Sequence, residues 1–121
     1  MSVSNKEHDS CSSELYSNLD KIRHLISEPA LYEQMAEECS ELSQALLKKA
    51  RKLRNENYTP KSYSEINDNL IEEYTDVRLC AMVLSLSIDE TILSEKLNRW
   101  IFRNSDIGKN LMANGESYET S

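Results

Sequence analysis

Residues that interrupt helices are scarce in this sequence. Only two glycines and two prolines occur among 121 residues, whereas a sheet-rich protein needs turn residues at frequent intervals. Leucine, glutamate, lysine, serine and asparagine are abundant instead. The composition therefore predicts an all-α fold. A chain of this length is expected to form one domain with a small hydrophobic core, which favours association with another subunit.

Cysteines are also few, and the sequence has neither long apolar runs nor an excess of positive charge. The three cysteines, Cys11, Cys39 and Cys80, are odd in number and widely spaced, which argues against a disulfide framework or a zinc ribbon. No apolar run approaches the roughly 18 residues of a membrane span, and the polar start lacks the hydrophobic region of a signal peptide. The formal charge of −7 argues against a general nucleic-acid binder, which needs a basic surface. We expect a cytoplasmic protein without membrane or nucleic-acid partners.

Capping residues and periodic apolar residues divide the chain into expected helices. Residues 1–12 are polar and without periodicity, so they predict a flexible tail. Ser27, followed by Pro29, predicts a helix start, because serine caps free N–H groups and proline is tolerated in the first turn. The expected elements are a helix over 13–26, a helix over 28–54, a loop over 55–63, a helix over 64–86 capped by Ser64, a helix over 87–103 opened by a Ser87-x-x-Glu90 capping box, and a tail or short docking segment over 105–121 with Gly108 and Gly115 as breakers.

Residues 13–104 are expected to form one helical domain, a bundle of four main helices with flexible termini. Cys39 and Cys80 are expected to be small buried residues. The apolar side chains expected to face inward are Leu15, Leu19, Ile22 and Ile26 in the first helix, Leu31, Met35, Leu42, Ala45, Leu46 and Leu53 in the second, Ile66, Leu70, Val77, Ala81 and Leu84 in the third, and Ile92, Leu93, Leu97, Trp100 and Ile101 in the fourth.

Two acidic pairs interrupt these apolar stripes. Glu38 and Glu41 lie three residues apart in the second expected helix, and so do Glu73 and Asp76 in the third, so each pair shares one helix face. A carboxylate directed at a core is costly unless a cation compensates it. Four carboxylates without a nearby histidine suit a hard cation such as Mg²⁺, with Mn²⁺ as a substitute. A solvated acidic face is the alternative, but the repetition of the pair favours a metal site.

Two groups of basic residues accompany the acidic pairs. Lys96, Arg99 and Arg103 form one stripe of the fourth expected helix, which suits either phosphate contacts or an ordinary solvated face. The cations within residues 48–54 lie at the end of the second expected helix, where the helix dipole favours positive charge. From Glu41 to Arg51 the helix rises about 15 Å, so these cations do not readily reach a phosphate held by their own subunit. A neighbouring subunit's site is the alternative.

Two segments carry a resemblance to a known family. The strings EQMAEECSELSQALLKKARKL and NLIEEYTDVRLCAMVL closely resemble the MazG-like all-α nucleoside triphosphate pyrophosphohydrolases, whose signature is E-x-x-E on one helix and E-x-x-D on the next. The resemblance covers about residues 31–103. It implies that Glu38, Glu41, Glu73 and Asp76 bind Mg²⁺ and that water attacks the α-phosphate of a nucleoside triphosphate, which releases a monophosphate and pyrophosphate.

The same resemblance implies an assembly and a phosphate-binding segment. The KLNRW string resembles the family's later basic helix, which implies that Lys96 and Arg99 contact the substrate phosphates. Members of the family form homodimers or dimers of dimers, so the same is expected here. Two other functions fit these residues: a dUTPase-like or phosphoribosyl-ATP pyrophosphatase with a different substrate pocket, and a non-catalytic helical interaction or regulatory module whose acidic faces bind a partner or a structural cation.

Overall fold

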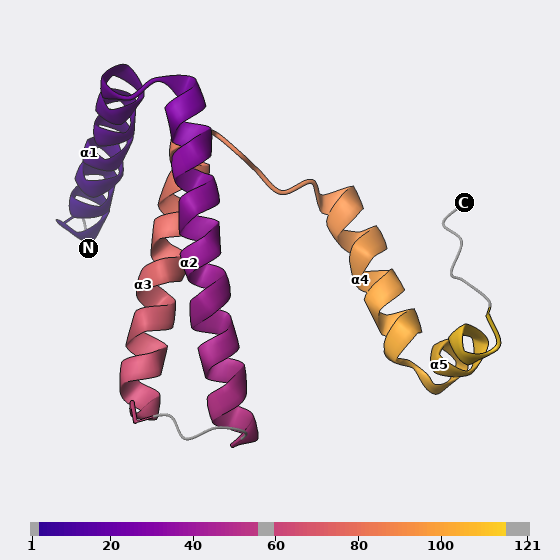
Figure 1. Ribbon diagram of the computed structural model, residues 1–121. Coiled ribbons are helices and arrows are strands. Elements are labelled where there is room, and N and C mark those ends of the chain that lie inside the picture. Colours follow the sequence, from indigo (N-terminus) through magenta and orange to yellow (C-terminus); the bar gives the residue numbers. More distant parts are fainter. Residues whose placement is uncertain (1–2, 56–59, 116–121) are drawn as a thin grey trace. The chain divides into compact units, whose positions relative to one another are not determined.

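The computed structural model describes residues 3–55 and 60–115, and the described residues form five helices (Figure 1). These are α1 (Val3–Leu25), α2 (Glu28–Arg54), α3 (Tyr63–Val83), α4 (Glu90–Asn104) and α5 (Asp106–Ala113). The prediction of an all-α fold is confirmed. The chain divides into two compact units, Met1–Leu86 and Ser87–Ser121, and the boundary falls inside the range 13–104 expected to be one domain. None of the described helices is long and apolar enough to cross a membrane.

The start and end of α2 follow directly from the sequence. Ser27 accepts a hydrogen bond from the backbone N–H of Ala30 at 3.4 Å, and Pro29 lies in the first turn. At the other end, Asn55 adopts the left-handed conformation with φ of 55°, which lets its N–H bond to the carbonyls of the last turn. The predicted helix over 28–54 is therefore confirmed. Of the expected loop that follows, residues 56–59 lie outside the described residues.

Two other helices begin at residues that the sequence analysis did not select. Helix α3 is capped by Ser62 instead of Ser64, because Ser62 forms both bonds of a capping box with Glu65, at 3.2 and 3.1 Å. Helix α4 is capped by Asp89 instead of Ser87, since Asp89 Oδ1 accepts from the N–H of Ile92 at 2.9 Å. In both cases two nearby residues could cap the helix. The residue that does so accepts a hydrogen bond from the N–H three positions later.

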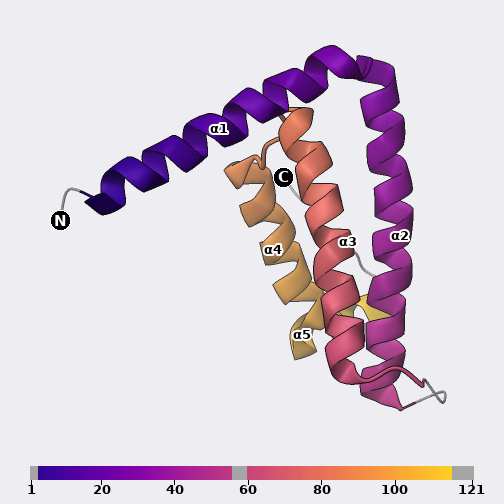
Figure 2. The same cartoon turned by 90° about the vertical axis from the view of Figure 1, so that its left-hand side faces the viewer.

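Helices α2 and α3 run antiparallel, side by side, in both views (Figures 1 and 2). Apolar side chains pack at their contact, and two of them, Ala45 and Ile66, are each 2% exposed. Toward the loop end of the pair, Lys49 Nζ donates to Asn67 Oδ1 at 2.6 Å. Lys49 and Lys52 also lie over the ring of Tyr63, each 5.2 Å from its centroid. The interface of this helical hairpin thus combines apolar and polar layers.

Not every residue of the expected α2 stripe faces α3. Leu46 and Leu53 are 51% and 61% exposed, so their expected place in the core is wrong. Leu46 follows the buried Ala45 directly, and consecutive residues of a helix are turned by about 100°. Cys39 is likewise exposed, whereas Cys80 is partly buried. A second face of α2 therefore carries apolar residues without a partner among the described residues of this hairpin.

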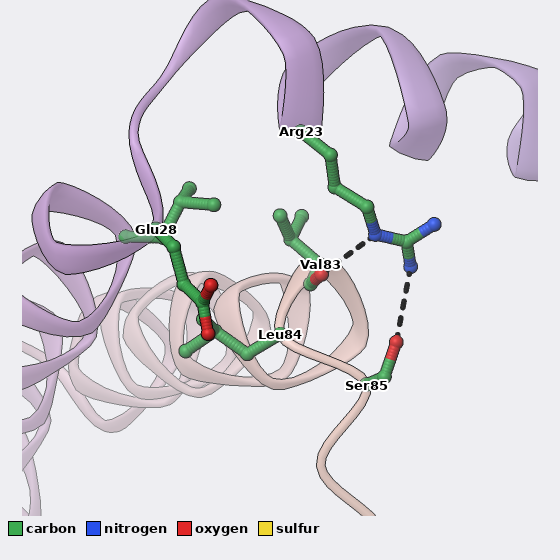
Figure 3. A pocket seen from close by; sticks show the side chains of 6 residues that line it. Arg23, Glu28, Val83, Leu84 and Ser85 are labelled. Carbon is green, nitrogen blue, oxygen red and sulfur yellow. Dashed lines mark hydrogen bonds between the residues drawn. The ribbon is translucent and has the colours of Figure 1, made fainter.

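Helix α1 begins at Val3, well before the expected start at Ser13, so residues 3–12 belong to the helix and not to a tail. Of its four expected core residues only Leu19 is buried, and it packs with Leu31 of α2 and Val83 of α3. Arg23 fixes this end of the hairpin, since its Nε donates to the carbonyl of Val83 at 2.8 Å (Figure 3). Its Nη2 also donates to the carbonyl of Met82 at 3.1 Å.

The same guanidinium pairs with Asp20 at 2.6 Å, so Arg23 is held in place while it caps the carbonyls at the end of α3. A cavity of about 280 Å³ lies beside it, and Glu28, Leu84 and Ser85 contribute to its lining. None of the four predicted metal ligands is among the described residues that line this cavity. The cavity therefore belongs to the junction of the three helices and not to the carboxylate site.

The second unit consists of α4 and α5. The apolar side chains of α4 that were expected in the core are exposed, from 49% for Ile92 to 66% for Trp100, so that expectation is wrong. Helix α5 starts after Ser105, whose Oγ accepts from the N–H of Gly108 at 3.1 Å. Gly108 lies buried within this helix and does not break it. Glycine is needed there because a Cβ would collide with the carbonyl group of Phe102.

Candidate functional site

Three of the four predicted metal ligands come together at the contact between α2 and α3. Carboxylate oxygens of Glu38, Glu73 and Asp76 all lie within 4.8 Å of one another. The three-residue spacing of Glu73 and Asp76 keeps both on the face of α3 that meets α2. Glu38 reaches them from the opposite helix because the two helices run antiparallel. We call these three residues the carboxylate cluster.

The members of the carboxylate cluster are partly withdrawn from solvent, since each is intermediate in exposure. Glu38 Oε1 accepts a hydrogen bond from the side-chain amide of Gln34 at 2.7 Å. Glu38 Oε2 and Glu73 Oε2 are covered, and neither has a hydrogen-bond donor among the described residues. A covered polar atom without a partner costs about 1–3 kcal/mol. These two oxygens are therefore available for a ligand that approaches from within the cluster.

Glu41, the fourth predicted ligand, is exposed and joins the cluster through Glu73. Burial raises the pKa of Glu73 above its ordinary value of 4.5, and the hydrogen bond with Glu41 and the charges of Glu41, Asp76 and Glu72 raise it further. Without a cation, Glu73 therefore holds a proton more readily than an isolated glutamate does.

The carboxylate cluster fits a divalent cation that prefers oxygen. Mg²⁺ binds oxygens at about 2.0–2.1 Å, so ligand oxygens on opposite sides of the ion are about 4 Å apart. Adjacent ligand oxygens are about 3 Å apart, so the cluster oxygens, which lie within 4.8 Å of one another, would draw closer by side-chain rotation to hold one ion. The two covered oxygens without donors supply the unpaired lone pairs that such an ion requires. The donor set consists of hard carboxylates, which matches Mg²⁺ or Mn²⁺ better than a soft metal.

Two residues near the carboxylate cluster were not assigned to the site from the sequence. Gln34 was overlooked, although its position four residues before Glu38 is the spacing at which helical side chains meet. Cys80 lies beside the cluster: burial raises the pKa of its thiol, and the charges of Glu38 and Asp76 and the proximity of Cys39 raise it further. A thiol held in its neutral form is a poor nucleophile, so the surroundings of Cys80 do not favour a nucleophilic role.

The predicted phosphate contacts are not part of the carboxylate cluster. Lys96 and Arg99 lie on α4, in the second unit, where Lys96 is exposed and Arg99 is partly buried. The basic residues at the end of α2 belong to the same unit as the cluster but lie at the loop end of the hairpin. Among them, Lys49 and Lys52 are tied to Asn67 and Tyr63 of α3.

Comparisons of the chain with protein families, with curated proteins and with solved structures give no match. A function for the carboxylate cluster is therefore inferred from the chemistry of its own residues.

Proposed function

We propose that the chain is a Mg²⁺-dependent nucleoside triphosphate pyrophosphohydrolase of the MazG-like type, acting as a cytoplasmic, homo-oligomeric helical bundle. The observation that carries this proposal is the pair of covered carboxylate oxygens, on Glu38 and Glu73, that have no donor among the described residues and face a third carboxylate from Asp76. Such an arrangement costs free energy unless a proton or a cation compensates it, and a divalent cation compensates all three carboxylates at once. The E-x-x-E and E-x-x-D signature of the sequence supports the nucleotide substrate.

In this proposal each carboxylate has a defined task. Glu38, Glu73 and Asp76 hold the ion, and Gln34 orients the Glu38 carboxylate through its 2.7 Å hydrogen bond. When bound, Mg²⁺ neutralises phosphate oxygens and lowers the pKa of the water that attacks the α-phosphate. Glu41 is the exposed carboxylate of the four and lies beside Glu73, so it is the best placed to accept a proton from water. The family resemblance also implies phosphate contacts by Lys96 and Arg99, through charge-assisted hydrogen bonds.

The test is pyrophosphate release from a panel of nucleoside triphosphates, including dUTP, with Mg²⁺ or Mn²⁺. The critical variants are Glu38→Gln and Glu73→Gln, which preserve size and remove one charge each. The sequence supplies matched controls, because Glu37 and Glu72 are the immediate neighbours of these residues and are exposed. Glu37→Gln and Glu72→Gln remove the same charge from the same helices but leave the cluster intact.

We expect activity to collapse in Glu38→Gln and in Glu73→Gln and to persist in both controls. The double variant should be scarcely worse than either single one, because ligands of one ion act as a unit. Circular dichroism must show that all variants remain helical. Equal rates for wild type and a cluster variant would remove that residue from the proposed mechanism, and an inactive wild type across the whole panel would favour the non-catalytic interaction module.

A further inference from the structure

Lys48 is the cation of α2 that lies nearest to the carboxylate cluster. It is the first basic residue of this helix and follows Glu41 by seven residues, a separation of nearly two full turns. Lys48 and Glu41 therefore share one face of α2, and their Cα atoms are about 10 Å apart along the helix axis. Arg51 is three residues further along and is turned away from Lys48 by about 60°. Among the cations of α2, Lys48 is thus the best placed to act near the cluster.

The Lys48 side chain is exposed and has no hydrogen-bond or ion-pair partner among the described residues. Its neighbour Lys49 differs, because it donates to Asn67 at 2.6 Å. Helical side chains lean toward the N-terminus of their helix, so the Lys48 ammonium group can approach the level of Glu41 by about one turn, or about 5 Å. The remaining gap of about 5 Å is of the order that two linked phosphates span.

Asn69 holds a corresponding position on the facing helix. It precedes Glu73 by four residues and Asp76 by seven, so the three side chains follow one face of α3. Asn69 is half-buried, and its side-chain amide has no hydrogen-bond partner within the described part of the chain. Its N–H donors are therefore available to a ligand that lies beside the cluster.

The register of the antiparallel pair places Lys48 and Asn69 in the same part of the hairpin (Figure 1). The carboxylate cluster marks one end of this part, and the hydrogen bond between Lys49 and Asn67 marks the other. Lys48 lies between these two markers along α2, and Asn69 lies between them along α3. Carboxylates that suit a metal ion are thus followed, toward the loop, by an ammonium group and an amide that can both donate to phosphate.

We propose that Lys48 and Asn69 bind the β- and γ-phosphates of the nucleoside triphosphate. This inference rests on the proposed function, in which water at the carboxylate cluster attacks the α-phosphate. The Lys48 ammonium group forms charge-assisted hydrogen bonds to phosphate oxygens, and the Asn69 amide donates a further one. The triphosphate then runs along the hairpin toward the loop between α2 and α3, and the nucleoside lies on the side of the cluster nearer to α1.

These contacts make pyrophosphate a direct probe of Lys48 and Asn69. Pyrophosphate, one of the two products, consists of the two phosphates that these residues hold. A nucleoside monophosphate keeps only the α-phosphate, which lies at the cluster and not beside Lys48. The two ligands therefore separate the proposed contacts from the metal site without any hydrolysis.

The test is calorimetric titration of the full chain in saturating Mg²⁺ with pyrophosphate, inorganic triphosphate and a nucleoside monophosphate as separate ligands. Lys48→Gln and Asn69→Ala should each weaken binding of pyrophosphate and triphosphate by about tenfold, because a donor to a charged acceptor is lost. Affinities for Mg²⁺ and for the monophosphate should equal those of the wild type. Lys48→Arg keeps the charge and should retain pyrophosphate binding. The matched control, Arg51→Gln, removes the same charge one turn further along α2 and should change none of these affinities.

The possible outcomes separate this inference from the proposed function. The substituted residues are not buried, so all variants should remain helical by circular dichroism. A wild type that binds no Mg²⁺ would overturn the proposed function and this inference with it. If the wild type binds Mg²⁺ but no pyrophosphate, or if Lys48→Gln and Asn69→Ala bind pyrophosphate as the wild type does, only this inference is overturned. An equal loss in Arg51→Gln would also overturn it, because general attraction by the basic end of α2 would then explain the binding.

Discussion

Replacing Glu38 by glutamine should stabilise the metal-free protein. In the wild type, Glu38 Oε2 is covered without a donor among the described residues, beside the carboxylates of Glu73 and Asp76. A glutamine amide keeps the acceptor for Gln34 and adds an N–H donor that can reach one of those carboxylates. Relief of one unpaired polar atom is worth about 1–3 kcal/mol. For a chain of this size that corresponds to an increase in Tm of about 4–12 °C.

The same substitution should remove the response to Mg²⁺. A ligand bound only by the folded protein adds about 2.7 kcal/mol at one hundred times its Kd, so the wild type should gain about 10 °C with saturating Mg²⁺. Thermal melts followed by circular dichroism, in EDTA and then in excess Mg²⁺, give both quantities. Glu37→Gln is the matched control and should behave as the wild type does. A lower Tm of Glu38→Gln in EDTA, or an undiminished rise with Mg²⁺, would refute the reasoning.

Two further predictions concern Glu73 and Arg99. The pKa of Glu73 in the folded protein is raised above 4.5, so the folded protein binds this proton more tightly than the unfolded chain does. The resulting stabilisation is complete at low pH and is lost as the pH rises through the folded-state pKa. Without metal, the Tm of Glu73→Gln should therefore rise relative to the Tm of the wild type as the pH increases from about 4 to 7. A difference in Tm that does not change with pH would contradict the raised pKa. Arg99→Ala should lower kcat/KM and leave Mg²⁺ affinity unchanged, and calorimetric titration with steady-state kinetics separates the two; unchanged kcat/KM would return Arg99 to the ordinary surface.

Local spacing along the sequence was enough to find most of the carboxylate site. Glu73 and Asp76 share a face in any helix, and the 28–54 helix was correctly bounded because Ser27 and Pro29 mark its start. Helical spacing also separated Glu38 from its exposed neighbour Glu37. What the sequence alone could not provide was the distance between the helices. The hydrogen bond that links Glu41 to Glu73 and the covered oxygens depend on how closely α2 and α3 pack.

The wrongly predicted helix caps and core residues have a common physical origin, since in each case neighbouring residues or faces of a helix compete for the same role. Ser62 and Ser64 are both serines able to cap a helix, and only the pairing of Ser62 with Glu65 decides between them. Leu46 and Leu53 belong to a face of α2 that adjoins the α3 contact, so a broad apolar stripe in the sequence merged two separate surfaces. The sequence pattern of α4 predicted an inward face, but apolar periodicity does not identify the partner that would cover it.

Two polar layers interrupt the apolar contact between α2 and α3, and the contrast between them indicates where a ligand belongs. In the layer near the loop, Lys49 donates to Asn67 and lies over the ring of Tyr63, so its charge is satisfied by the protein itself. In the layer of Glu38 and Glu73, Gln34 donates to one Glu38 oxygen, and Oε2 of each glutamate has no donor within the described part of the chain. The charges of the neighbouring carboxylates have the same sign. Both layers lie along the same helix pair, so a general tolerance for polar residues in this contact does not explain the difference. The basic layer finds its partners within the protein, whereas the acidic layer has no positive partner among the described residues. A divalent cation would supply that partner.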